Sequence, residues 1–364
     1  MEMILKKDYF YKGTEALCQR NLDEAEEYFL KSYREEKCEK GLEYLLYLYL
    51  IKSNYKNILN IFQKNPNLKG FSLYSLYWYK FMTGELDELS DILYKMLAED
   101  NYFIKIFAIK ELYKDKKITD LQAVLKQKVK FFGLSYDIPI EEQRASVFLD
   151  YLNERFHLSL LQAKTLLKDY PGIPDVYIDF IEICENSSNQ DYIKEIINHE
   201  SFLKLMNTDY RLLYIYSKQL YKMGEFEKAR GILNTLLNYF RHNPIFHFNM
   251  GNVYLQINKL LKAVDCYEEA ISLAPLFERA YYNLGCVYFK LGDLSRAIKN
   301  FQESVRISKK PDAIYNLSVC LIEKKELQEA FCYLNKIPNW YTPKLSPNSI
   351  KKQIKEIVVF TRAF

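Results

Sequence analysis

Along most of the chain, large apolar residues recur every three or four positions, in stretches of about a dozen residues. This spacing puts the apolar side chains on one face of an amphipathic helix. The stretches come in pairs: one starts near Ile245, and its partner starts at Leu260 after a short polar turn. The pattern predicts an all-α protein built from helix–turn–helix units.

The strongest internal similarity lies in three segments, which read IFHFNMGNVY, RAYYNLGCVY and DAIYNLSVCL. At spacings of 34 and then 33 residues they repeat an asparagine (Asn249, Asn283, Asn316) and, two positions later, a small residue (Gly251, Gly285, Ser318). At the same spacings the second stretch of each pair repeats an alanine (Ala263, Ala297, Ala330) and, four positions later, a large residue (Tyr267, Phe301, Leu334). A fixed period of this length indicates stacked structural repeats.

This pattern of small and aromatic residues resembles the tetratricopeptide repeat. The resemblance implies a right-handed superhelical solenoid, in which Gly251 and Ala263 let the two helices of a unit approach closely. In the turns KMGEFEKA and KLGDLSRA, Gly224 and Gly292 are expected to end a helix in the left-handed conformation, and Asp293 is expected to favour the start of the next helix.

The repeats vary in quality along the chain. Residues 210–337 form well-matched repeats, and Gly13, Leu22, Ala25 and Phe29 fit the same template near the amino terminus. Between these lie degenerate units, whose turns are predicted at 51–57, 83–88, 115–120, 157–163 and 186–191. About ten helix pairs account for the length of 364 residues.

This reading divides the chain into five parts. Degenerate repeats occupy 1–129 and 144–209, and the segment 130–143, with Gly133 and Pro139, is a candidate break between them. Well-formed repeats occupy 210–337. The last part, 338–364, joins a proline-rich run to an amphipathic helix that is expected to cap the array and that carries Ile350, Ile354, Ile357 and Val358 on one face.

The composition of the chain excludes several classes of protein. Hydrophobic residues make up 49% and charged residues 27%, which indicates a folded protein, and a net charge of +4 does not favour nucleic acid as a partner. The most apolar stretch, 42–51, is too short to span a bilayer, so we expect no membrane insertion. The amino terminus has no apolar core of signal-peptide length, so we expect no signal peptide and a cytoplasmic location. Seven cysteines without a C-x-x-C pair indicate neither a disulfide framework nor a zinc site.

No motif of an enzyme appears in the sequence. The four histidines are scattered, and neither a phosphate-binding glycine loop nor a G-x-S-x-G motif is present. We therefore expect no catalytic residue, no bound metal and no cofactor, and interpret the protein as a non-enzyme.

The resemblance assigns certain first-helix positions to a concave groove, and we call these positions the inner face. In the three clear units they are Ile245, Phe248, Asn249 and Asn252, then Arg279, Tyr282, Asn283 and Cys286, then Asp312, Tyr315, Asn316 and Val319. Asparagine both donates and accepts hydrogen bonds, so a row of them could hold the backbone of a partner peptide. They could instead satisfy neighbouring helices, and Phe248, Tyr282 and Tyr315 could pack against the next repeat.

Basic residues extend this predicted surface. Arg211, Lys218 and Lys222 of the preceding unit, together with Arg279 and Lys290, would form a basic wall that attracts an acidic peptide. Ordinary solubilising charge is the alternative interpretation.

The sequence thus predicts a protein-interaction scaffold, in which 210–337 binds an extended or helical segment of another protein or peptide. The alternative is a peptide-responsive regulator whose superhelix changes when it binds a ligand. Self-association is compatible with both.

Overall fold

The computed structural model describes residues 9–19, 21–65, 67–99, 101–114, 140–152, 155–186, 189–338 and 341. These residues form helices joined by short turns, and none of them is in a strand. Helices that follow one another in the chain pack in neighbouring pairs. The expected all-α architecture of stacked helix pairs is confirmed.

The chain forms two compact units, residues 1–219 and 220–364, and the division falls within a helix. Unit 1 contains α1 (Tyr9–Cys18), α2 (Leu22–Glu35), α3 (Glu39–Ile51), α4 (Tyr55–Lys64), α5 (Ser72–Thr83), η1 (Leu86–Glu88), α6 (Leu89–Ala98), α7 (Tyr102–Lys114), α9 (Ile140–Leu152), α10 (Phe156–Asp169), α11 (Pro174–Asn186), α12 (Gln190–Ile197), α13 (Glu200–Met206) and most of α14 (Tyr210–Lys222).

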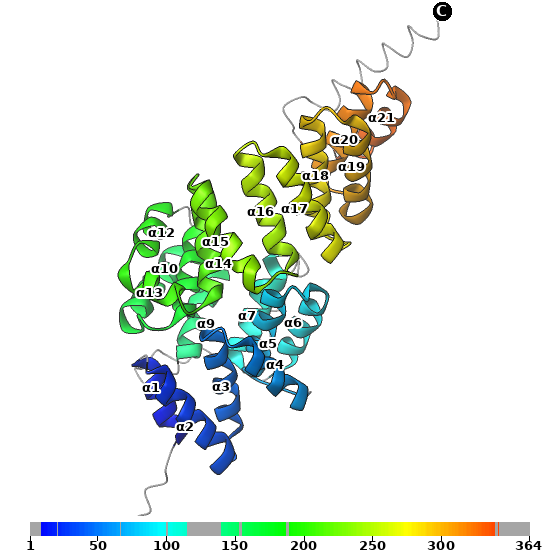
Figure 1. Ribbon diagram of the computed structural model, residues 1–364. Helices are drawn as coiled ribbons and strands as arrows, with labels where there is room; N and C mark the ends of the chain where they lie inside the picture. Colours follow the sequence, from blue (N-terminus) through cyan, green and yellow to red (C-terminus); the bar gives the residue numbers. More distant parts are fainter. Residues whose placement is uncertain are drawn as a thin grey trace, which may run out of the picture. The chain divides into compact units, whose positions relative to one another are not determined.

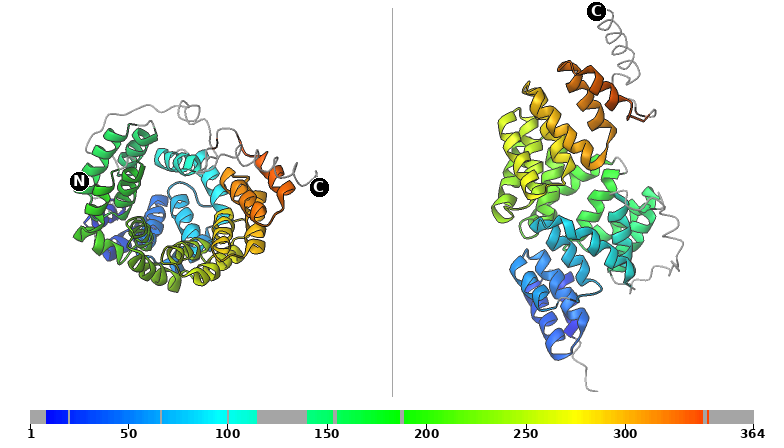
Figure 2. Two further views of the ribbon diagram at one scale, coloured as in Figure 1. Left: turned by 90° about the horizontal axis from the view of Figure 1, so that it is seen from above. Right: turned by 90° about the vertical axis from the view of Figure 1, so that its right-hand side faces the viewer.

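Unit 2 continues with the end of α14 and, among its described residues, seven further helices. These are α15 (Phe226–Tyr239), α16 (Pro244–Gln256), α17 (Leu260–Leu273), α18 (Glu278–Lys290), α19 (Leu294–Ser308), α20 (Pro311–Glu323) and, completing the last pair, α21 (Leu327–Leu334). From α16 to α21 the helices lie side by side in chain order, first helix against second (Figures 1 and 2).

The close approach of the two helices in a repeat depends on the small residues. A Cβ atom at Gly251 would lie 2.6 Å from Cε1 of Tyr267, and one at Gly285 would lie 2.9 Å from Cδ1 of Phe301. Ala263 is fully buried on the opposite helix. The aromatic ring of the second helix therefore fills the space that the missing side chain leaves on the first.

The turns follow the predicted chemistry. Gly224 and Gly292 have φ of 81° and 79°, and the Asp293 side chain accepts a hydrogen bond from the backbone N–H of Arg296 at 2.9 Å, which caps α19. At the equivalent turns, Asn258 and Lys325 adopt the same left-handed conformation with φ of 58° and 66°. The register of the repeat, rather than glycine itself, fixes this conformation.

One predicted turn is wrong. Residues 157–163 lie inside α10, and the turn precedes it at Arg155. The buried Ser159 is the fourth residue of α10, as Ala229 and Ala263 are in α15 and α17, and Ala163 lies four residues further along the helix.

Several other predicted boundaries fall wholly or partly outside the described residues. Of the candidate break at 130–143, residues 130–139 lie outside the described residues, and α9 already begins at Ile140. The predicted turn at 115–120 and the expected capping helix also lie outside the described residues. The two units divide ten residues later than the predicted start of the well-formed repeats.

Candidate protein-binding surfaces

In unit 1 the first helices meet through a buried network of charged side chains. The Arg211 guanidinium donates two hydrogen bonds of 3.0 Å to the two carboxylate oxygens of Asp175, and a further one of 2.7 Å to Oδ2 of Asp209. All three residues are fully buried. Each ionic group therefore depends on the others for its stability, because water does not reach them.

The same network joins helices that are distant in sequence. Arg144 on α9 binds Asp179 on α11 through Nε at 2.6 Å, and Tyr47 on α3 donates to Asp175 across 128 residues of chain. Tyr74 on α5 also donates to Asp175. Burial by itself raises the pKa of Asp175, but Arg211 and Arg144 outweigh burial and hold that pKa well below its ordinary range.

This arrangement corrects one predicted site residue. Arg211 was expected on an accessible basic wall, but its side chain is 0% exposed and pairs with two aspartates. Of the other two basic residues on α14, Lys218 is half-buried with Nζ 6.0 Å from the Tyr214 ring centre, and Lys222 is exposed. A partner could reach these lysines, but it could not reach Arg211.

In unit 2 the inner face is partly open, and its asparagines differ from one another. Asn252 Oδ1 accepts hydrogen bonds of 2.7 Å from both Tyr267 Oη and Asn283 Nδ2, and Asn316 Nδ2 donates to Tyr282 Oη at 2.9 Å. Three of the four predicted asparagines therefore already help to join successive repeats.

Asn249 differs from these three. It is half-buried, and its side chain forms no hydrogen bond with a described residue. It is the inner-face asparagine of this unit whose amide is most available to a partner.

The predicted aromatic residues are half-buried. Phe248 lies 4.9 Å from the ring centre of Phe277, which leads into the next repeat, and Tyr282 lies 5.8 Å from that of Phe301 within its own repeat. Tyr315 packs at 6.2 Å against Tyr341. These rings fill space within and between repeats and also leave part of their surface uncovered.

A further row of apolar residues was not among the predicted site residues. Leu255, Phe289 and Ile322 follow Phe248, Tyr282 and Tyr315 by seven positions, which places both rows on the same face of α16, α18 and α20. Phe289 is 37% exposed, and the other two are half-buried. The signal was present in the sequence, since this row repeats at the same spacings of 34 and 33.

The charges along this face are few. Arg279 is exposed and forms no ion pair with a described residue, and Lys290 is exposed at the end of the same helix. Asp312 stands at the position of Arg279 one repeat later. The face is thus mainly apolar and amide in character, with one basic and one acidic group at equivalent places.

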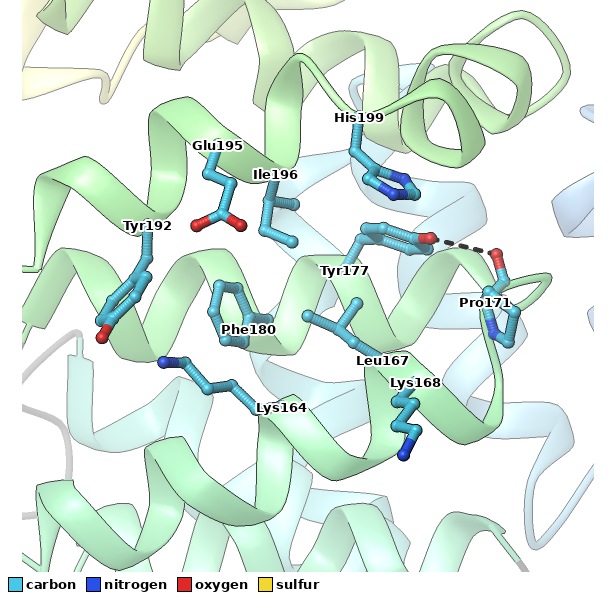
Figure 3. A pocket seen from close by; sticks show the side chains of 10 residues that line it. All are labelled: Lys164, Leu167, Lys168, Pro171, Tyr177, Phe180, Tyr192, Glu195, Ile196 and His199. Atoms are coloured by element: carbon cyan, nitrogen blue, oxygen red, sulfur yellow. Dashed lines mark hydrogen bonds between the residues drawn. The ribbon is translucent and has the colours of Figure 1, made fainter.

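Unit 1 also has an open surface, which is a hollow of about 520 Å³ between α10, α11 and α12. The hollow has an apolar floor, formed by Leu167, Phe180 and Ile196 (Figure 3). Lys164 and Lys168 of α10 form one rim, and Tyr192 of α12 lies on the other. Lys164 Nζ lies 3.5 Å from the ring centre of Tyr192 on the opposite rim. The second helix here, α12, has eight residues, whereas α10 and α15 have 14, so it covers α11 over a shorter length.

Within the part of the chain that the structure describes, no group of three or more His, Cys, Asp or Glu residues is placed to hold a metal ion. No described helix is both long and apolar enough to cross a membrane.

Comparison with known proteins agrees with the geometry. A family model described as TPR repeat matches residues 251–292, and one described as tetratricopeptide repeat matches residues 278–310. No curated protein sequence matches the chain.

Solved structures share the fold at low sequence identity. The crystal structure of the APC/C hetero-tetramer Cut9–Hcn1 matches with a TM-score of 0.59 and 13% identity, over 95% of this chain and 75% of that one. PilW, a type IV pilus biogenesis factor, matches with a TM-score of 0.50 and 13% identity, over 59% of this chain and 97% of its own.

Scaffolds of this fold bind other proteins through their stacked first helices. The two family matches, together with the paired helices of the described residues and the small residues that join them, show that the chain contains tetratricopeptide repeats, which supports a role as a protein-interaction scaffold in general.

Proposed function

We propose that unit 2 binds an extended or helical segment of a partner protein along the inner face of α16, α18 and α20. The observation that carries this proposal is the pair of aligned apolar rows, headed by Phe248 and Leu255, which leave partly exposed surface on three successive helices. Apolar surface arranged in this way suits the apolar face of a peptide or helix.

The contrast with unit 1 supports the choice of surface. There the corresponding first-helix positions are closed by the buried pairs of Arg211 with Asp175 and of Arg144 with Asp179. In unit 2 the equivalents of Arg211 are Ile245, Arg279 and Asp312, which form no such buried pair with one another. The inner face of unit 2 is therefore the more accessible of the two.

The polar groups of the inner face would orient the bound segment of the partner. Asn249 offers an amide that is not already bonded, and Arg279 offers a guanidinium for an acidic residue of the partner. Without Arg211, the predicted basic wall is reduced to the exposed Lys222, Arg279 and Lys290 and the half-buried Lys218.

The test compares proteins that are captured from a lysate of the source cells and identified by mass spectrometry. Phe289→Glu places a charge on the inner face, and Leu261→Glu places the same charge on a second helix at a side chain that is 71% exposed. We expect a partner that is recovered by the wild type and by Leu261→Glu and lost with Phe289→Glu. Asn249→Ala should weaken its recovery without affecting the fold, as circular dichroism can confirm.

Equal recovery by all variants would show that the partner binds elsewhere. The hollow beside Lys164 and Tyr192 would then be the next surface to examine, since it lies in the degenerate repeats.

A further inference from the structure

Tyr341, which follows the last described helix, lies against the inner face. Tyr341 Oη donates a hydrogen bond of 2.5 Å to Oδ1 of Asp312, and its ring lies 6.2 Å from that of Tyr315 at an angle of 54°. The backbone N–H of Tyr341 donates to the carbonyl of Pro338 at 3.1 Å. The chain thus turns after α21 and brings an aromatic side chain onto α20.

Asp312 and Tyr315, which the Tyr341 side chain contacts, belong to the predicted inner face. Asp312 and Tyr315 are the counterparts, one repeat later, of Arg279 and Tyr282. Residues three apart on a helix are surface neighbours, so the carboxylate and the ring lie next to each other. Together they offer an acceptor for a hydroxyl group and a surface for an aromatic ring.

The chemistry favours a tyrosine over other side chains. Asp312 forms no ion pair with a described residue, so its carboxylate is available to a neutral donor. Hydrogen bonds to a charged acceptor are stronger than those between neutral groups. A tyrosine hydroxyl is protonated at neutral pH and able to donate, and burial and the bond to Asp312 raise the pKa of Tyr341 further. Phenylalanine would keep the ring contact and lose this bond.

We propose that Asp312 and Tyr315 form a tyrosine-binding subsite at the α20 end of the inner face, which the chain fills with its own Tyr341 and which a tyrosine-bearing segment of a partner takes over. The second half of this inference rests on the proposed function of unit 2. The first half concerns only the chain itself.

Tyr341 belongs to the same chain as the subsite, so it competes strongly with a tyrosine on a separate molecule. A side chain tethered by a short linker reaches an effective concentration of roughly millimolar. A segment that binds the same subsite in trans must therefore displace Tyr341, and its apparent affinity is lower as long as Tyr341 is present. Removing the Tyr341 side chain should expose the subsite without altering Asp312 or Tyr315.

The test uses the full chain and a fluorescein-labelled synthetic peptide with the sequence of residues 336–346. Fluorescence polarisation measures peptide binding to the wild type, to Tyr341→Ala and to the double variant Tyr341→Ala, Asp312→Ala. We expect Tyr341→Ala to bind the peptide at least about tenfold more tightly than the wild type. The double variant should lose most of this binding, and a peptide with Phe in place of its Tyr should bind the single variant more weakly.

A matched control is the double variant Tyr341→Ala, Asp265→Ala, which removes the same type of side chain from an exposed position on the second helix α17 and should retain peptide binding. The proposal is wrong if Tyr341→Ala, folded by circular dichroism, fails to bind the peptide at millimolar concentration, or binds it equally well without Asp312. These results do not depend on lysate capture, so a failure of the proposed partner site and a failure of the subsite can be told apart.

Discussion

The guanidinium group of Arg211 and the carboxylate of Asp175 form two parallel hydrogen bonds, each 3.0 Å long, in a place where both side chains are fully buried. Paired geometry of this kind is the strongest form of a charged hydrogen bond. It is also costly to interrupt, because the group that remains is a buried charge without its partner.

We predict that Arg211→Ala destabilises the protein by about 3–5 kcal/mol, since Asp175 and Asp209 lose their shared cation. Arg279→Ala is the matched control, because Arg279 has the same place in its repeat and is exposed. It should change the free energy of unfolding by less than about 0.5 kcal/mol. Urea unfolding followed by circular dichroism measures both, and equal effects of the two substitutions would contradict the structural role of the pair.

We predict opposite effects for two glycine substitutions in unit 2. Gly251→Ala should destabilise by about 1–3 kcal/mol, because the new Cβ would lie 2.6 Å from the Tyr267 ring and the helices must separate. Gly231→Ala on α15 meets no atom within 4 Å and should stabilise by about 0.5–1 kcal/mol, since alanine favours the helix. Thermal unfolding of both variants checks the signs, and a stabilised Gly251→Ala would disprove the close contact.

A pH dependence is expected from Glu43. Burial raises its pKa to about 7, although a hydrogen bond from the backbone N–H of Phe71, 3.1 Å long, works in the opposite direction. Between its ordinary value of 4.5 and about 7, the folded protein therefore holds a proton that the unfolded chain has released. Folding is favoured at the lower end of this window, and the stability contributed by this group is lost as the pH rises through it.

Glu43→Gln should remove this contribution and keep the acceptor for the Phe71 N–H. We expect the wild type to lose about 1–2 kcal/mol relative to this variant between pH 4.5 and pH 7.5, after allowance for partial exposure. Urea titrations of both proteins at the two pH values give this difference directly. A difference that is constant with pH would mean that Glu43 titrates normally.

The sequence by itself determined the helical repeat. The positions of Gly251, Ala263 and Tyr267 recur at a fixed period. Each of these residues packs against the next or the preceding helix in the chain, so the geometry of a helix pair can be derived without knowledge of the rest of the molecule. The turn at 157–163 was misplaced because Ala163 was taken as part of the turn, whereas it lies seven residues after the start of α10, about two helical turns inside the helix.

Only the tertiary structure decided which equivalent positions are accessible. Arg211 and Arg279 have the same residue type and the same repeat position, yet one is buried and the other exposed. The difference arises from Tyr47 and Tyr74, which come from helices more than 100 residues away and close the space around Asp175. Likewise, the place of Tyr341 on α20 follows from the path of the chain after the last repeat. Local periodicity specifies contacts between neighbours, and contacts between distant helices depend on how the whole array is packed.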